Sequence, residues 1–367
     1  MAEFYQQLGH NSKTYCSTTM GHCPCFFINI RSIYLTGLST SLRQLTEKAF
    51  NRAKTGLQPS TNKSYTTKFR LFIAFCVYHK VQLLSISSTV LLAFLEFLVS
   101  QKFTYASVLN HLSAIRTLLP LHNIPNQACF HKTISLFMAA LKQARPYRTP
   151  LRPIITIPIL HNIITHTALS HCAFVFKAAY LLAFFSFLRI SNLVPHAAHQ
   201  FDHTKHLCPG DIIFAPPGAH IVIKWSKTMQ ARDKAKVVQI PAISDSPLCP
   251  IRALKQLLRL TPGHKNSPLF QILAQGKWVP LTDSILRKNL TSILRLLQLH
   301  KSGITFHTFR RSGASLAFQL NVDIQQIQSH GLWTSECVWR YIIRDSQTTN
   351  QVALSFQNLL ATPTTTS

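Results

Sequence analysis

The sequence predicts a mainly α-helical protein with a small β-sheet, built as an all-helical N-terminal domain followed by a mixed α+β domain. At 367 residues, the chain is long enough to bury two full cores. Apolar residues recur at helical spacing through residues 43–145, whereas stretches rich in Val and Ile, typical of strands, come later. Between these parts, the segment 143–153 contains three prolines and three arginines, which favour a solvated linker over a continuous helix.

Five helices are expected in the N-terminal domain. Apolar stripes define four of them, and the start signals Ser60-Thr61 and Ser87-Ser88 precede two. The third stripe ends near Pro120, because proline interrupts the helical hydrogen-bond ladder. The expected helices cover residues 43–55, 61–78, 90–98, 108–119 and 134–141.

The C-terminal domain combines a buried helix, a β-hairpin and further helices. We expect the buried helix over residues 172–192, with Arg189 near its end. Two strands, 219–225 and 235–240, are joined by a polar hairpin over residues 226–234. Further helices are expected at residues 250–259, 282–297, 307–320 and 335–345.

These elements predict five regions along the chain. The first is an N-terminal extension whose role the sequence does not assign, and the last is a C-terminal tail with apolar residues spaced among polar ones. The predicted boundaries are 1–42 for the extension, 43–145 for the helical domain, 146–153 for the basic linker, 154–346 for the C-terminal domain and 347–367 for the tail.

The charge of the chain points to a polyanionic partner. Lys and Arg number 38 against 11 acidic residues, a net charge of +27 spread along the whole chain. Such a charge strains a compact monomer by self-repulsion unless a polyanion neutralises it, and nucleic acid is the partner we expect, with binding that weakens steeply in salt. An anionic membrane surface and a ribosome-like setting are the alternatives. The apolar run 172–188 contains Lys177 and is shorter than the roughly 20 residues that span a bilayer, so we expect no membrane segment.

The cysteines and carboxylates limit the possible chemistry further. Nine cysteines, an odd count, without a clear signal peptide predict reduced thiols in an intracellular compartment. Cys16, His22, Cys23 and Cys25 could hold zinc, but no second pair follows at finger-like spacing, so we predict no metal site. The scarcity of carboxylates also speaks against a magnesium-dependent nuclease.

Six side chains in the second half of the chain suit cleavage of a phosphodiester without metal. That reaction needs neutralised non-bridging oxygens, an in-line nucleophile and a proton for the leaving oxygen. Arginine binds two phosphate oxygens with a planar fork, and histidine exchanges protons near neutrality. A tyrosine, whose phenol has a pKa of about 10, becomes a nucleophile beside cations and a proton acceptor. The six are Arg189, Lys227, His307, Arg310, Trp333 and Tyr341.

Two of the positions also have a simpler interpretation. Arg189 alone could be a surface residue after an apolar helix, and Tyr341 could share an apolar helix face with Val338 and Ile342. His307 and Arg310 are three residues apart and so share one helix face, with Phe306 and Phe309 expected to anchor that helix in the core. Other residues compete for some of the six roles: Arg311 for Arg310, Lys224 and Lys234 for Lys227, and His330 as a weaker acid–base group.

In their order and spacing, the six positions resemble the tyrosine recombinase (phage integrase) family over roughly residues 45–345. The resemblance implies a SAM-like core-binding domain, particularly at residues 104–116, and a catalytic domain that forms a covalent 3′-phosphotyrosine. In this comparison Lys227 protonates the leaving oxygen, and Trp333 stands where many members carry a second histidine. The eight-residue gap between Trp333 and Tyr341 looks most like DIRS-like and Crypton-like recombinases of eukaryotic mobile elements, which implies the nucleus.

One position departs from the family pattern. An acidic residue usually stands three positions after the first arginine, and here Asn192 takes its place. An amide can still hydrogen-bond Arg189 or His307 and orient them, but it adds no charge. A domesticated DNA-binding protein without catalysis and a type IB topoisomerase-like enzyme are therefore the two rival interpretations.

The expected partner is double-stranded DNA, bound by a homodimer or homotetramer, with no cofactor. The basic linker is expected to cross the DNA backbone so that the two domains clamp the duplex. The tail contains Val352, Leu354 and Phe356, and by resemblance it docks into a neighbouring subunit. The residues predicted to contact DNA are Arg116, Arg145, Arg148, Arg152 and Arg311.

Overall fold

The computed structural model describes residues 39–83, 86–122, 124–144, 153–167, 172–226 and 235–342. The chain divides into two compact units between Thr149 and Pro150, and each unit has its own cluster of buried hydrophobic residues. Several predictions fall outside the described residues: those for the extension up to residue 38, Arg145, Arg148, Arg152, Lys227, Lys234 and the tail.

The N-terminal unit is helical in all its described elements, as predicted. Its helices are α4 (Thr40–Thr55), α5 (Pro59–Tyr78), α6 (Ser88–Ser100), α7 (Tyr105–Leu121) and α8 (Lys132–Gln143), with a 3₁₀ turn η2 (Gln127–Phe130). Ser87 caps α6 by accepting from the Val90 N–H, and Thr104 caps α7 in the same way. Phe72 of α5 and Phe94 of α6 meet edge to face at 5.0 Å inside the core.

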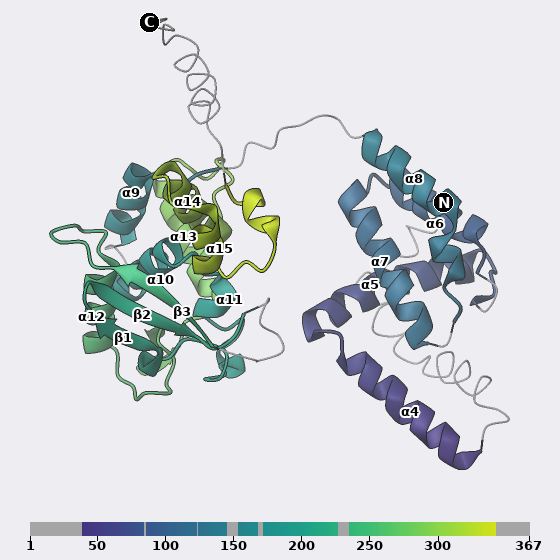
Figure 1. Cartoon of the computed structure of the whole chain (residues 1–367), viewed down its shortest axis with the longest axis horizontal. Helices are drawn as coiled ribbons and strands as arrows, with labels where there is room; N and C mark the ends of the chain where they lie inside the picture. The colour runs from purple at the N-terminus through teal and green to yellow at the C-terminus, as the bar shows by residue number, and fades with distance from the viewer. Residues whose placement is uncertain are drawn as a thin grey trace, which may run out of the picture. The chain divides into compact units, whose positions relative to one another are not determined.

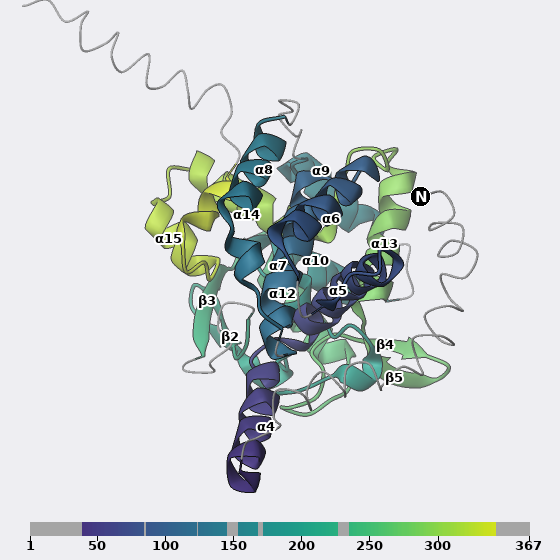
Figure 2. The same ribbon diagram turned by 90° about the vertical axis from the view of Figure 1, so that its right-hand side faces the viewer.

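The third predicted helix ends near Pro120, as expected. Helix α7 includes Pro120 and ends at Leu121. A proline in a final turn still removes a donor, but the chain leaves the helix directly afterwards, so the loss is small. In both views α4 projects away from the other helices of this unit (Figures 1 and 2).

The C-terminal unit places a helical bundle beside a small antiparallel sheet (Figure 1). Its main helices are α9 (Ile157–Thr167), α10 (Ala173–Phe185), α12 (Pro250–Leu260), α13 (Asp283–Leu296), α14 (Phe306–Gln319) and α15 (Ile324–His330). The sheet has the order β1-β2-β3, formed by Ile212–Ala215, Gly218–Ile223 and Lys236–Pro241. A second hairpin pairs β4 (Gln271–Ala274) with β5 (Lys277–Pro280). A mainly helical fold with a small sheet is thereby confirmed.

The pairing of β2 with β3 defines the limits of the predicted hairpin. Strands β2 and β3 pair antiparallel, and their last partners are Ile223 and Lys236. The two strands predicted at 219–225 and 235–240 are confirmed to within two residues. Strands β1, β4 and β5, at four residues each, are too short to show alternation and were not predicted. Helices α9 and α15 were also not predicted.

Two helix predictions are wrong in the region of the candidate site. Residues 172–192 do not form one helix, because α10 ends at Phe185 and a separate short helix, α11, covers Ile190–Leu193. Between them Phe187 takes a left-handed conformation with φ 50°. In the described part of the segment predicted as a helix from 335 to 345, residues Glu336–Arg340 form a 3₁₀ turn, η5. In both places, contacts with distant parts of the chain determine the conformation of the backbone.

Within the described residues, no helix combines the length and the apolar character needed to cross a bilayer.

Candidate active site

Helix α14 presents His307 and Arg310 because its neighbouring residues are fixed in the core. Thr308 accepts from the Thr305 backbone N–H at 3.0 Å, which sets the first turn. Phe306 and Phe309 are buried, as predicted, and Phe309 stacks on the Tyr180 ring of α10 at 5.2 Å. Because Phe306 and Phe309 face the core, the adjacent face at the start of α14 carries both His307 and Arg310.

Arg310 is the largest fully buried side chain of the described residues, with 1% of its surface exposed. Its guanidinium donates to the Phe187 carbonyl and, at 2.7 Å, to the Gly331 carbonyl. The Trp333 ring lies over the guanidinium, with Cζ 4.0 Å from the ring centroid. The Nε of Arg310 has no hydrogen-bond partner.

Two glycines make this approach possible. A Cβ on Gly331 would lie 1.8 Å from the Trp333 ring, so only glycine lets that ring lie flat against α15 and over Arg310. A Cβ on Gly313, one turn after Arg310, would lie 2.2 Å from the Phe184 carbonyl oxygen and 2.6 Å from the Phe187 ring. The missing side chains thus allow α14 to contact the end of α10.

Arg189 lies at the start of α11, just beyond the Phe187 turn. Its backbone N–H donates to the side-chain oxygen of Asn192 at 3.3 Å, and the Asn192 amide nitrogen donates to the Trp225 carbonyl at 2.7 Å. One guanidinium nitrogen of Arg189, Nη1, is buried without a hydrogen-bond partner. The positive charge of Arg189 contributes to lowering the pKa of both Arg310 and His307.

Tyr341 lies at the edge of this cluster with its ring against three of the predicted residues. Its ring centroid is 5.2 Å from that of His307 and 4.8 Å from that of Trp333, and the Arg310 Cζ is 5.2 Å from it. The Ser315 hydroxyl of α14 donates to the Tyr341 carbonyl at 3.0 Å, which ties the end of η5 to the helix that carries Arg310.

The apolar face proposed as the simpler interpretation of Tyr341 is also present. Val338 and Ile342 are buried, together with Phe187, Ile327 and Trp333, in a small hydrophobic cluster separate from the main core of this unit. Tyr341 packs on its edge and stays partly exposed. Val338 and Ile342 therefore anchor the segment, and Tyr341 faces His307 and Arg310.

The concentration of positive charge alters the titration of the site. Partial burial, and then the charges of Arg310, Arg311 and Arg189, lower the pKa of His307 to about 4, although the residue remains exposed on its outer side. Burial and the charge of Arg189 also lower the pKa of Arg310, whereas Tyr341 opposes this change. In the DNA-free protein at neutral pH, His307 is a neutral imidazole and can accept a proton.

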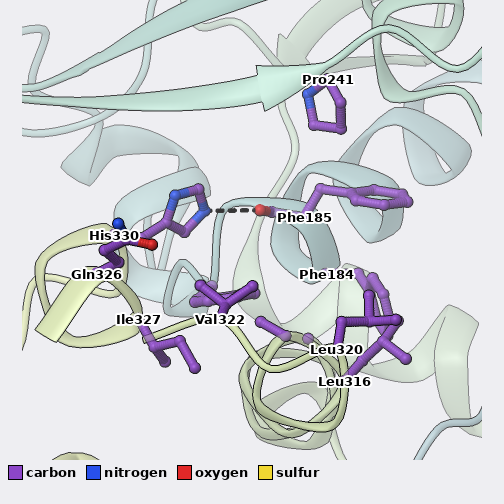
Figure 3. Close-up of a pocket in the computed structure, with 12 residues that line it drawn as sticks. Phe184, Phe185, Pro241, Leu316, Leu320, Val322, Gln326, Ile327 and His330 are labelled. Atoms are coloured by element: carbon purple, nitrogen blue, oxygen red, sulfur yellow. Dashed lines mark hydrogen bonds between the residues drawn. The ribbon is translucent and has the colours of Figure 1, made fainter. Parts of the chain in front are cut away.

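Two of the competing residues, Lys224 and His330, are engaged by other partners. The Lys224 ammonium forms an ion pair with Asp211 at 2.5 Å, whose carboxylate also accepts from the Cys208 backbone N–H. His330 hydrogen-bonds the Phe185 carbonyl at 2.8 Å and lines an apolar pocket of about 380 Å³ (Figure 3). Arg116, in the other unit, donates from two nitrogens to the Cys129 carbonyl and lies over the Phe130 ring. The predicted contacts of Arg116 and Arg311 with DNA stay predictions.

Sequence reasoning missed the residues that hold Arg310 in place. Phe187 and Gly331 supply carbonyl oxygens to Arg310, and nothing in the sequence marks a backbone oxygen for that role. Gly313 could have been singled out from the sequence, because a glycine inside a helical pattern often marks a close packing contact. Among the described residues, no three His, Cys, Asp or Glu side chains gather as a metal site requires. Cys16, His22, Cys23 and Cys25 lie outside those residues.

Comparison with solved structures identifies the fold. The XerH site-specific recombinase, in a post-cleavage complex with a palindromic difH substrate, aligns with a TM-score of 0.56 and 16% identity, covering 81% of this chain and 80% of that one. The Tn1549 transposon integrase, in complex with transposon right-end DNA, aligns with a TM-score of 0.53 and 9% identity, covering 90% and 98%. Neither a protein-family profile nor a curated protein sequence matches this chain.

At these identities the similarity establishes the fold. The chain has the fold of the tyrosine recombinases and integrases, and the predicted resemblance is confirmed at that level. The closer likeness to DIRS-like and Crypton-like elements stays a prediction.

Proposed function

We propose that this protein is a site-specific DNA recombinase or integrase that cleaves and rejoins double-stranded DNA through a 3′-phosphotyrosine on Tyr341. One observation carries the proposal: three buried N–H donors of the candidate site, namely Arg189 Nη1, Arg310 Nε and Trp333 Nε1, have no hydrogen-bond partner. Buried donors nearly always find an acceptor, so these three are suited to one that arrives from outside. A phosphodiester brings two anionic oxygens to such donors.

The reaction follows from the chemistry of the clustered side chains. Arg189 and Arg310 neutralise the charge that develops on the non-bridging oxygens. His307, neutral at pH 7, accepts the phenol proton as Tyr341 attacks the phosphorus. The new O–P bond forms as the bond to the 5′ oxygen breaks, and by resemblance Lys227 gives that oxygen a proton. The phosphotyrosine conserves the bond energy, so a 5′ hydroxyl from another strand can reverse the step without ATP.

The proposed substrate is double-stranded DNA from the ends or the circular form of a mobile element. The net charge of +27 supports a DNA partner, and the XerH and Tn1549 structures named above are complexes with DNA. Paired protomers would each cut one strand, exchange ends through a four-way junction and then repeat the process. We place this activity in the nucleus if the host is eukaryotic.

The first test is a covalent-trapping assay. A nicked suicide substrate from the element's own ends, incubated with the protein in EDTA, traps the phosphotyrosine because the leaving strand diffuses away. We expect a covalent adduct with the wild type, none with Tyr341→Phe, and an unchanged yield with Tyr78→Phe, a partly exposed tyrosine of α5. Salt-sensitive binding without an adduct would instead support the DNA-binding protein that has lost catalysis. Relaxation of supercoils without strand exchange would support the topoisomerase-like enzyme.

The proposed assembly has its own test. The tail, residues 347–367, is expected to connect protomers, so its removal should reduce higher-order assembly on DNA in sedimentation or native gels. Unchanged assembly after truncation would exclude this role.

A further inference from the structure

The side-chain amide of Asn192 makes two hydrogen bonds, one as an acceptor and one as a donor. Its oxygen accepts from the Arg189 backbone N–H at 3.3 Å, and its nitrogen donates to the Trp225 carbonyl at 2.7 Å. With 3% of its surface exposed, the side chain is closed off from water that could replace either partner. A backbone N–H can only donate and a carbonyl can only accept, so the partners themselves fix the orientation of the amide.

The hydrogen bond to Arg189 is local, whereas the one to Trp225 joins segments that lie 33 residues apart. One segment is the start of α11, which carries Arg189. The other leaves β2 after Ile223 and leads directly into the hairpin that contains Lys227. Helix α11 has only four residues, and the β2–β3 pairing ends at Ile223 and Lys236, so neither segment is fixed at this point by its own element.

We propose that Asn192 is a positioning residue that holds the Arg189 segment against the base of the β2–β3 hairpin, and that this task requires an amide rather than a carboxylate. The inference rests on the proposed function, because it assigns a catalytic consequence to the connection. A carboxylate at position 192 could still accept from the Arg189 N–H. Its second oxygen would face the Trp225 carbonyl, so a hydrogen bond would be replaced by two acceptors in contact.

This proposal reverses the simplest expectation for Asn192. Taken alone, the absence of the usual acidic residue suggests a weakened enzyme, and Asn192→Asp would then restore activity. The hydrogen bonds predict the opposite: in this chain Asn192→Asp slows DNA cleavage, because it breaks the link to the hairpin. A misplacement of about 1 Å between reacting groups can lower a rate about 100-fold, and we expect a 10- to 100-fold loss.

The experiment compares Asn192→Asp and Asn192→Leu, two variants of similar volume, with the wild type. Single-turnover cleavage of the suicide substrate gives the rate, and fluorescence anisotropy gives the dissociation constant for the same DNA. Asn266→Asp, in the exposed loop between α12 and β4, introduces the same charge in the same unit and serves as the matched control. We expect both Asn192 variants to lose rate and to melt at a lower temperature than Asn266→Asp, because a buried hydrogen bond is lost, while the DNA affinity of the folded protein stays close to that of Asn266→Asp.

Hydrogen exchange of the DNA-free protein adds a readout that does not depend on activity. Peptides from 186–194 and from the hairpin base, 218–226 and 235–241, should exchange faster in both Asn192 variants and remain unchanged in Asn266→Asp. If the wild type forms no adduct, the proposed function fails, and the exchange data still decide whether the amide holds the two segments together. Wild-type cleavage and exchange in Asn192→Asp would overturn the proposal. A parallel fall of melting temperature, DNA affinity and rate would also overturn it, because that pattern indicates a merely structural residue.

Discussion

The Arg310 guanidinium divides its donors between the protein and the proposed phosphate. Two nitrogens bind the carbonyls of Phe187 and Gly331, and the Trp333 ring covers one face of the group. The remaining Nε points to no acceptor in the protein. A lysine could not reproduce this arrangement, because its ammonium is a point charge without the planar fork that binds two backbone oxygens and an anion together.

The lowered pKa of His307 predicts how the cleavage rate depends on pH. Its pKa of about 4 in the DNA-free protein should be visible in an NMR titration of the imidazole protons. A bound phosphodiester places negative charge beside the ring and raises this pKa. On the acidic side of the pH–rate profile, cleavage should therefore decline at a pH above 4. His307→Gln should lose that decline along with most of its rate. An acidic decline that persists unchanged in His307→Gln would contradict the role of this residue as proton acceptor.

The same shift predicts how stability depends on pH. The folded pKa of His307 lies below its ordinary value of 6.5, so the unfolded chain binds more protons at acidic pH. Stability should therefore fall as the pH is lowered from about 6.5 towards 4. Thermal melts at pH 7 and pH 5 should show a smaller loss for His307→Gln than for the wild type. His111, His206 and His330 also have lowered pKa values and are common to both proteins, so the comparison isolates His307.

At the scale of elements, the site depends on how closely α14 approaches the end of α10. Gly313→Ala should push α14 away, because the new Cβ would lie 2.2 Å from the Phe184 carbonyl oxygen. We expect a loss of about 1–3 kcal/mol of stability, as for an overpacked core, together with reduced cleavage. A Gly→Ala change in an unhindered helix normally stabilises by about 0.5–1 kcal/mol, so a more stable Gly313→Ala protein would contradict this packing.

The β2–β3 hairpin gives a second prediction at this scale. Lys224 is held by Asp211 at 2.5 Å, so we expect Lys227 to be the residue that protonates the leaving oxygen. Lys227→Ala should slow cleavage, and a substrate with sulfur at the bridging 5′ position should restore it, because a thiolate leaves without protonation. Lys224→Ala should cleave both substrates at nearly wild-type rates. Sulfur rescue of Lys224→Ala or Lys234→Ala, and not of Lys227→Ala, would reassign the role.

For the whole molecule, the dominant property is charge. DNA affinity should fall linearly on a log–log plot against salt, with a slope of about −0.9 for each phosphate contacted. If Arg145, Arg148 and Arg152 each contact one phosphate, replacing all three by glutamine should reduce the slope by about 2.7, three times the value per contact. Replacing the three arginines by lysine keeps the charge and should keep the slope. An unchanged slope in the glutamine variant would exclude the predicted role of the linker.

Local patterns were sufficient to predict most of the helices and part of the site. The helical stripes of the N-terminal unit gave α5 to α8, and the Val- and Ile-rich segments gave β2 and β3. His307 and Arg310 could be placed on one face of α14 because a helix of that length keeps a regular period. The errors lie at residues 186–189 and 336–341, where the backbone departs from a regular element because it packs against other parts of the chain.

The sequence by itself determined the fold class, the positive charge and the types of side chain available for phosphodiester chemistry, since these depend on composition and on local period. Only the tertiary structure decided that Phe187 and Gly331 bind Arg310, that Gly313 lets two helices meet, and that Asn192 connects Arg189 to Trp225. These contacts join residues 21 to 123 positions apart, and their partners are backbone atoms that every residue carries. For that reason no local sequence pattern marks the carbonyl partners of Arg310 and Asn192, although a glycine within a helix can point to a close contact such as that of Gly313.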